Sequence, residues 1–258
     1  MSKELVKKQF GANAAAYATS AVHAQGASLA RLVELVQPQP GWRALDVASA
    51  AGHTAFAFAP HVAQVVVTDL TPEMIPVAAK LAAERGIANV TLELADAEAL
   101  PYGDGEFDLV TCRIAPHHFP HIDRFMAEAA RVLRPLGILA VVDNVVPGGE
   151  SAADEAGAYI NAFEALRDPS HHRALSVAEW MAAYAAAGFT LLHVETAPKR
   201  MAFTAWAGRM GVTLPTLAEL RRRLVDAPPA AAAFFAVEAA GDDLSFTLEE
   251  AIFVGRKP

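Results

Sequence analysis

The chain has 258 residues, of which 53% are hydrophobic, and its formal net charge is −8. A chain of this length forms one large domain or two small ones, and this apolar content suffices for a sizeable core. The negative charge, with no Lys/Arg-rich arm, argues against a nucleic-acid partner.

The sequence carries no mark of a membrane or secreted protein. No run reaches the ~18 uninterrupted apolar residues of a membrane helix, and the first ten residues lack a signal-peptide core. A single cysteine, Cys112, cannot form an internal disulfide and is expected to lie buried in a strand. These features predict a cytoplasmic protein without a membrane partner.

Residues 1–40 are expected to form one or two helices, and from Trp42 short apolar runs alternate with helical patterns. This alternation predicts a parallel sheet whose strands are covered by helices. The expected strands are residues 43–47, 64–69, 90–94, 107–112, 138–143, 189–196 and 251–256. The expected helices between them are residues 54–59, 72–85, 124–133 and 177–187.

The helix expected at residues 72–85 has typical boundary residues. Thr71 is a candidate N-cap, Pro72 suits the first helical position, and Gly86 follows the end. Pro76 is less usual, because it removes one early hydrogen bond.

Two segments, 147–176 and 198–244, are too long to be plain connections between strands. We expect them to form a helical cap over the sheet edge where ligands bind. The predicted organisation is a single domain, residues 1–258, with N-terminal helices at 1–40 and a cofactor-binding core at 41–145.

The most informative segment is residues 45–55, LDVASAAGHTA. Asp46 ends the first strand, small residues follow, and a helix is expected after Gly52. Small residues let a backbone approach a ligand closely, and a helix start offers free N–H groups. Asp69 ends the second strand, where a carboxylate can accept both hydroxyl hydrogens of a ribose.

Two further observations narrow the choice of nucleoside. The loop is not G-x-G-x-x-G, which disfavours a nicotinamide dinucleotide. Asp96 follows the third strand, where it can accept a hydrogen bond from the exocyclic amine of an adenine.

In this order the motifs resemble those of the class I S-adenosylmethionine-dependent methyltransferases. The resemblance is to the methyltransferase type 11 branch, related to the enzymes of ubiquinone and menaquinone biosynthesis. It spans about residues 42–190, with a weaker extension over residues 13–23. The segments that carry it are LDVASAAGHTA, VVTDLTPEM, DAEALPYGDGEFDLVTCR, HHFPHIDRFMAEAARVLRPLGILAVVDN and RDPSHHRALSVAEW.

The resemblance implies a Rossmann-like, seven-stranded, mostly parallel sheet with the last strand antiparallel and helices on both faces. It implies transfer of a methyl group from S-adenosylmethionine to a small molecule, with S-adenosylhomocysteine as product. C- or O-methylation of an aromatic or quinone-like acceptor is the family-level expectation. No sequence motif identifies the acceptor or the oligomeric state.

The resemblance also implies roles for individual positions. Asp46 would orient the loop or contact the methionine amino group, and Asp69 would hold the ribose hydroxyls. The other implied cofactor contacts are Tyr17, Ser20, Ala48, Ser49, Ala50, Gly52, Leu70, Met74, Asp96, Ala97, Arg113 and Ile114.

The loop departs from the family pattern at Ala50, where the family has glycine. If the position requires a positive φ, an alanine there costs on the order of 1 kcal/mol. The alternative hypothesis is therefore a protein that binds S-adenosylmethionine without transferring methyl. Such a protein would catalyse a cyclisation or rearrangement, or act as a non-catalytic partner.

His117 and His118 follow the fourth strand at the ligand-binding end of the sheet and are the candidate catalytic residues. A histidine suits the removal of a proton from a phenol, an alcohol or an enolisable carbon. The alternative is that one of them packs in the loop or contacts the cofactor. Together with His121 they match no metal-ligand motif, so no metal is expected.

The segment RDPSHH has two interpretations. The resemblance makes Arg167, Asp168 and His171 an element of a lid or substrate pocket, with Arg167 and His171 as substrate contacts. The alternative is a salt-bridged turn, because Asp-Pro favours the start of a turn. Three aromatic residues of the long segments either line an acceptor pocket or anchor the cap; they are Tyr159, Phe163 and Trp206.

Overall fold

The computed structural model of the chain describes residues 3–18, 26–149, 151–241 and 243–258, without the side chains of residues 13, 15–18 and 240. The chain separates into two compact units. Unit 1 comprises Met1–Asp143, Met181–Glu195 and Ile252–Pro258, and unit 2 comprises Asn144–Trp180 and Thr196–Ala251.

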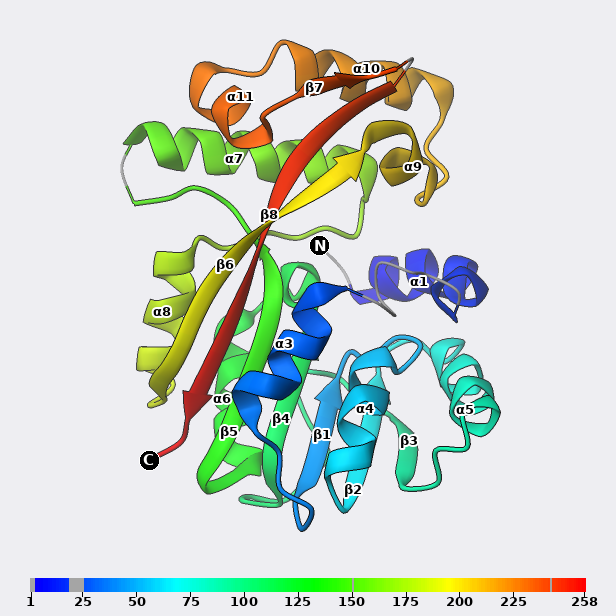
Figure 1. Cartoon of the computed structure of the whole chain (residues 1–258), viewed down its shortest axis with the longest axis vertical. Coiled ribbons are helices and arrows are strands. Elements are labelled where there is room, and N and C mark those ends of the chain that lie inside the picture. Colours follow the sequence, from blue (N-terminus) through cyan, green and yellow to red (C-terminus); the bar gives the residue numbers. More distant parts are fainter. Residues whose placement is uncertain (1–2, 19–25, 150, 242) are drawn as a thin grey trace. The chain divides into compact units, whose positions relative to one another are not determined.

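The sheet of the described residues has eight strands (Figure 1). In the order in which they pair, the first seven are β3 (Val90–Leu94), β2 (Gln64–Asp69), β1 (Arg43–Val47), β4 (Phe107–Arg113), β5 (Leu133–Val145), β8 (Asp243–Arg256) and β6 (Thr190–Ala202). The eighth, β7 (Glu238–Ala240), pairs antiparallel with β8. The pairs among β1 to β5 are parallel, so the expected mostly parallel sheet with antiparallel pairing at its last strands is confirmed.

The sheet of unit 1 is covered on both faces, which explains its nearly continuous apolar strands. Alternate strand residues such as Ala44, Val65 and Leu109 pack in one cluster with helices α3 (Ala27–Val36), α4 (His53–Phe58) and α5 (Met74–Glu84). Figure 1 shows α6 (Ile122–Val132) behind the sheet. The remaining helical elements of unit 1 are α1 (Lys3–Ala18), η1 (Ala59–His61) and η2 (Pro116–His118), and α8 (Val177–Ala186) has residues in both units.

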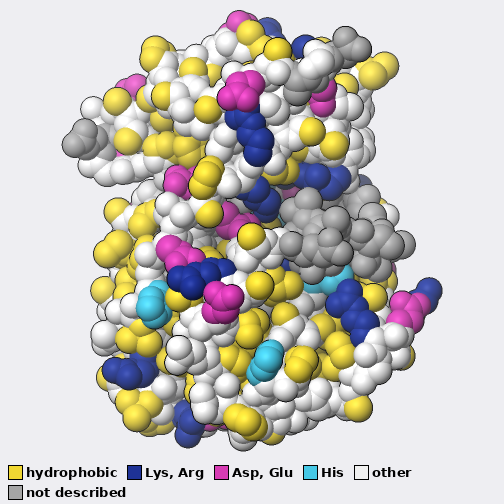
Figure 2. Space-filling model, viewed as in Figure 1, with side chains coloured by type: hydrophobic (Ala, Val, Ile, Leu, Met, Phe, Trp, Pro, Cys, Tyr) yellow, Lys and Arg dark blue, Asp and Glu magenta, His cyan; other side chains and the backbone are white. Residues whose placement is uncertain are grey.

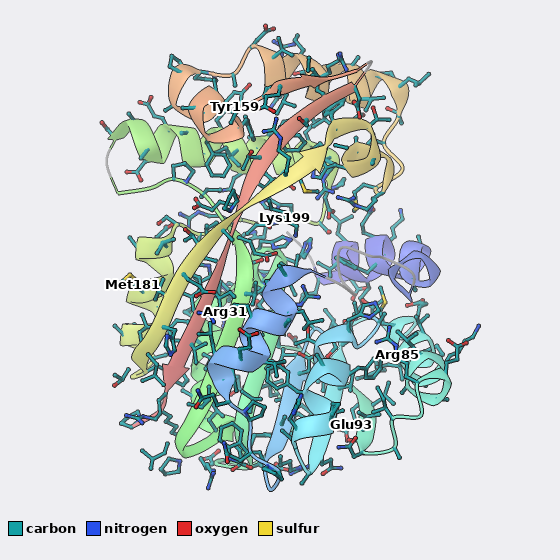
Figure 3. All side chains as sticks on the ribbon, viewed as in Figure 1. Arg31, Arg85, Glu93, Tyr159, Met181 and Lys199 are labelled. Carbon is teal, nitrogen blue, oxygen red and sulfur yellow. The ribbon has the colours of Figure 1, made fainter. Side chains whose placement is uncertain are left out.

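An ion pair also joins α3 to the last strand of the sheet within unit 1. Arg31, labelled in Figure 3, donates from Nε and Nη2 to the two carboxylate oxygens of Glu195, at 2.8 and 2.9 Å. A planar guanidinium matches a carboxylate in this bidentate arrangement.

The sequence predicted β1, β2 and β3 with the observed bounds, but other boundaries differ. β5 begins at Leu133 and β8 at Asp243, several residues before the expected starts. Pro135 and Gly137 concealed the first extension, whereas residues 243–249 alternate polar with apolar side chains, a strand pattern that the expectation missed. The sheet has one strand more than the seven expected. The additional strand is β7, whose three residues are too few to show a periodic pattern.

The start of α5 also differs from the expectation. The helix begins at Met74 with Glu73 at the N-cap, so Thr71 is not the cap. The backbone N–H of Met74 donates to the carbonyl of Thr71, which makes residues 71–74 a turn before the helix. Pro76 then lies in the first helical turn, where a missing N–H leaves no helical hydrogen bond unmade.

Unit 2 contains both long segments that the sequence singled out, and it has its own hydrophobic cluster. Its helices are α7 (Ser151–Arg167), α9 (Phe203–Gly208), α10 (Leu214–Val225) and α11 (Pro229–Phe235) (Figure 1). The rings of Phe163 and Trp206 stack at 5.0 Å in this cluster, and each is at most 1% exposed. Tyr159, labelled in Figure 3, donates its hydroxyl to the Arg223 carbonyl at 2.7 Å. All three aromatic residues therefore belong to the packing of unit 2.

Among the described residues, no helix is long and apolar enough to cross a membrane. On the face drawn in Figure 2, basic and acidic side chains are interspersed with apolar ones.

Candidate functional site

Polar side chains of unit 1 gather at the carboxyl ends of neighbouring parallel strands, the edge of an α/β sheet where ligands bind. Asp46 on β1, Asp69 at the end of β2 and Asp143 on β5 are 1, 8 and 1% exposed. Burial raises the pKa of the Cys112 thiol on β4 well above its ordinary value, and the negative charges of these three carboxylates raise it further. Cys112 is thus a buried strand residue, as predicted, and stays protonated.

Asp46 holds the strand, the loop and the following helix together. Its Oδ1 accepts from the Thr111 hydroxyl at 2.6 Å, and its Oδ2 accepts from the backbone N–H of Ala55 in α4 at 3.1 Å. Burial raises the pKa of Asp46 to about 6, although these hydrogen bonds and the charge of Arg113 favour the ionised form. Of the two roles implied for Asp46, orientation of the loop is the one these contacts support.

The loop after β1 has an unusual backbone. Ala48, Ala50 and Gly52 have φ values of 53°, 48° and 84°, the left-handed region that disfavours residues with a Cβ. The positive φ whose cost the sequence analysis considered for Ala50 is therefore present, and Ala48 shares it. The loop is closed by hydrogen bonds from Ser49 N to the Thr68 carbonyl and from Ser49 Oγ to the Asp46 carbonyl, at 2.8 and 2.7 Å.

Asp69 is fixed by backbone donors on both of its oxygens. Oδ2 accepts from Ala50 N–H and Oδ1 from Thr71 N–H, each at 2.8 Å. Burial raises the pKa of Asp69, and these backbone hydrogen bonds oppose the rise. Nearby, Leu70 is half-buried, whereas the side chain of Met74 is 0% exposed and lies in the interior.

Asp96 follows β3, as expected, and its carboxylate already has partners. Lys3 of α1 donates to Oδ2 at 2.5 Å, and Oδ1 accepts from the backbone N–H of Glu98 at 3.0 Å. Lys3 also pairs with Glu98 at 2.7 Å, while the adjacent Ala97 is buried. The N-terminal helix therefore contacts the segment that the sequence assigned to the adenine.

The end of β4 is strained. Arg113 is 9% exposed, and its Nε donates to the Thr54 hydroxyl at 3.0 Å. Ile114, a β-branched residue, has a φ of 54° and donates its N–H to the Val142 carbonyl at 2.7 Å. A positive φ at a β-branched residue is a genuine outlier, and such strain is common at functional sites.

The two candidate histidines differ in their contacts. His117 Nδ1 lies 2.5 Å from Oδ1 of Asp143, and both side chains are buried. The ring of His118 lies 4.2 Å from that of His117, and the ring of Phe10 on α1 meets it edge-on at 4.9 Å. Sequence reasoning did not select Asp143, although it is the acid at the carboxyl end of the fifth expected strand and so repeats the pattern of Asp46 and Asp69.

The implied cofactor residues Tyr17 and Ser20 cannot be placed in this site. The backbone of Tyr17 belongs to α1, but its side chain lies outside the described part of the chain. Ser20 lies outside the described residues altogether.

Arg167 and His171 belong to unit 2, where both have structural partners. Arg167 Nη2 donates to Glu164 at 3.0 Å, and its guanidinium lies 4.5 Å from the centre of the Trp206 ring. His171 Nε2 lies 2.8 Å from Oδ1 of Asn161, which holds it in the fold.

The RDPSHH segment is closed on itself by Asp168. Its carboxylate accepts from the Ser170 N–H at 2.9 Å, and its carbonyl accepts from the His171 N–H at 2.9 Å. Together with the Arg167–Glu164 pair, these bonds form the salt-bridged turn that was one interpretation of the segment.

Comparison with known proteins identifies relatives of the chain. Residues 45–141 match the model of a family described as a methyltransferase domain. The chain is 33% identical over 250 residues to the uncharacterized methyltransferase YcgJ of Bacillus subtilis, covering 96% of this chain and 97% of that protein. It is 38% identical over 103 residues to the ubiquinone/menaquinone biosynthesis C-methyltransferase UbiE of Brucella anthropi, a match that covers 38% of this chain and 39% of that protein.

A solved structure shows the same fold. A Bacillus halodurans protein named for a methyltransferase superposes with a TM-score of 0.85 at 36% identity, over 90% of this chain and 100% of that one. The similarity therefore extends well beyond the residues matched by the family model.

Proposed function

This chain belongs to the methyltransferase-domain family, and from that premise we propose that it uses S-adenosylmethionine to methylate a small molecule. The expected product of the cofactor is S-adenosylhomocysteine. When bound, the cofactor supplies a methyl group activated by a sulfonium sulfur.

The observation that carries this proposal is the geometry of Asp69. A carboxylate at the end of β2 is held by backbone N–H groups of Ala50 and Thr71, one on each oxygen. These bonds, together with those from the Thr71 hydroxyl and the Leu70 N–H, orient the carboxylate at the carboxyl end of β2, where the hydroxyls of a ribose can donate to it. The residues present therefore fit a nucleoside cofactor.

Other residues of unit 1 would hold the rest of the cofactor. We propose that the loop backbone from Ala48 to Gly52 binds the methionine part, with Asp46 fixing the loop rather than contacting the cofactor. Asp96 and Ala97 would bind the adenine edge. Further contacts, in keeping with the resemblance, are Tyr17, Ser20, Leu70, Met74, Arg113 and Ile114.

When the acceptor carries a proton that must be removed, residues of this chain would also act as the base. His117 and His118 lie just after β4, on the segment that follows the strained Ile114. An imidazole there can accept the proton as the acceptor attacks, and both side chains are buried, which limits the access of water. In unit 2, Arg167 and His171 are the residues we propose for acceptor binding.

Calorimetric titration tests the proposal. We expect S-adenosylmethionine and S-adenosylhomocysteine to bind and NAD to give no heat of binding, because the loop lacks the dinucleotide glycine pattern. Failure of both sulfur compounds to bind would reject the proposed function. Formation of S-adenosylhomocysteine on addition of acceptors then separates methyl transfer from binding without transfer.

Asp69→Ala should weaken S-adenosylmethionine binding at least tenfold, which is roughly 1.4 kcal/mol. The reason is the loss of the acceptor for the ribose hydroxyls. Asp123→Ala is a matched control, since Asp123 is an exposed acid on α6. Equal affinities of both variants and the wild type would remove Asp69 from the site.

A further inference from the structure

The buried pair of His117 and Asp143 is the feature that the proposed cofactor site does not use. His117 lies on η2, after β4, and is 7% exposed, while Asp143 lies on β5 and is 1% exposed. Their closest atoms, Nδ1 and Oδ1, are 2.5 Å apart. These two residues are 26 positions apart and meet because β4 and β5 pair in parallel.

The pairing determines where the imidazole carries its proton. An ionised carboxylate only accepts hydrogen bonds, so Nδ1 of His117 must be the donor. In the neutral ring the lone pair is then on Nε2, the atom that can take a proton. A carboxylate that orients a histidine in this way also stabilises the imidazolium that forms afterwards.

Asp143 itself depends on this contact. Its second oxygen, Oδ2, is buried and has no hydrogen-bond partner among the described residues. Burying a carboxylate is costly unless it is paired, so His117 supplies an important part of its compensation. If the two residues had only a structural role, an apolar pair of similar volume would fill the same space at a lower cost in free energy.

The surroundings distinguish His117 from His118. His118 stacks obliquely on His117 and meets Phe10 edge-on, so its contacts include aromatic packing. His117 pairs through Nδ1 with the carboxylate of Asp143. This contact gives His117 the tautomer and the orientation of a base.

We propose that His117 is the general base, that Asp143 is its positioning residue, and that the acceptor carries a removable proton on a hydroxyl or an enolisable carbon. This inference rests on the proposed function. In the hydroxyl case the proton passes to Nε2 of His117, and an oxygen electron pair forms the bond to the methyl carbon. The sulfur keeps the electron pair of the broken carbon–sulfur bond and becomes a neutral sulfide. A neutral amine offers its lone pair without prior proton removal and needs no such pair.

The first test measures the tautomer of His117 by ¹⁵N NMR, with His117→Gln to assign its signals. We expect the proton on Nδ1 in the wild type and a changed tautomer distribution in Asp143→Asn. A proton on Nε2 in the wild type would overturn the proposal. This measurement requires neither cofactor nor acceptor, and its wild-type arm stands even if Asp143→Asn does not fold.

The second test measures S-adenosylhomocysteine formation with two libraries matched in ring skeleton, one of phenols and enols and one of amines. We expect turnover with the first library. His117→Gln should lower kcat by about 100-fold and Asp143→Asn by at least about tenfold, with the KM for S-adenosylmethionine within twofold of wild type. The control His61→Gln, at an exposed histidine outside the site, should retain kcat near the wild-type value.

Three outcomes would overturn the proposal: turnover of amines only, turnover of neither library, or wild-type kcat in both the His117 and Asp143 variants. Calorimetry with S-adenosylmethionine separates this failure from failure of the proposed function. If the wild type binds no S-adenosylmethionine, the proposed function fails, whereas intact binding with an unaffected kcat rejects only the roles of His117 and Asp143.

Discussion

Two regions of the molecule carry clusters of buried polar residues, and they use them differently. In unit 1, acids at the ends of β1, β2 and β5 are surrounded by a strained backbone at Ala48, Ala50 and Ile114. In unit 2, the segment from Asn161 to Ala174 has no described non-glycine residue at positive φ, and Asn161 and Asp168 make hydrogen bonds within the segment.

The difference lies in the strain of the backbone. Such strain persists only where the surrounding fold enforces it, and it is common at functional sites. Mutual hydrogen bonds, as in Asp168 with Ser170, stabilise a loop.

The largest effect is expected for Asn161→Ala in unit 2. Asn161 Oδ1 accepts from Ala174 N–H at 2.7 Å and pairs with His171, while Nδ2 donates to the Ala174 carbonyl at 3.0 Å. Its loss should lower the free energy of unfolding by about 2–4 kcal/mol, because these buried groups lose their partners. Denaturant unfolding measures the change, with Gln39→Ala, a site with an exposed hydrogen bond, as control. A change as small as that of the control would contradict the structural interpretation of this segment.

The next effect is a pH dependence that comes from Asp46. Burial raises its pKa to about 6, whereas an unfolded chain has the ordinary value near 4. The folded state therefore holds this proton to higher pH, and stability falls as pH rises from about 4 to about 6. The expected contribution is about 2–3 kcal/mol. Asp46→Asn removes this titration, so the difference in unfolding free energy between wild type and variant should change across this window and then level off. If the difference in unfolding free energy between wild type and variant were constant from pH 4 to 7, the predicted titration of Asp46 would be refuted.

The smallest effect tests the strained loop. Ala50→Gly should raise the free energy of unfolding by about 0.5–1 kcal/mol, because glycine adopts the left-handed conformation without the Cβ penalty. Affinity for S-adenosylmethionine should be equal or higher. The matched control is Ala30→Gly on an exposed position of α3, which should lower stability by about the same amount. If both variants changed the free energy of unfolding in the same direction, the strain of the loop would not contribute to stability.

The acids Asp46 and Asp69 were predictable because each ends a short, strongly apolar run followed by small or turn residues. That local pattern also located the first three strands with the observed bounds. The role of Asp143 was missed because its contact with His117, 26 positions away, depends on the pairing of β4 with β5. The start of β5 was missed because Pro135 and Gly137 interrupt its pattern.

The amino-acid sequence by itself determined the order of the elements in the core and the acids that follow its strands, because hydrophobic periodicity and strand-end residues are local properties. Only the tertiary structure decided that His117 meets Asp143, that two segments 22 or more residues apart share the core of unit 2, and that Ala48 and Ala50 adopt positive φ. These features depend on contacts between residues distant in the chain, and such contacts are set by how strands pair and helices pack rather than by any local pattern.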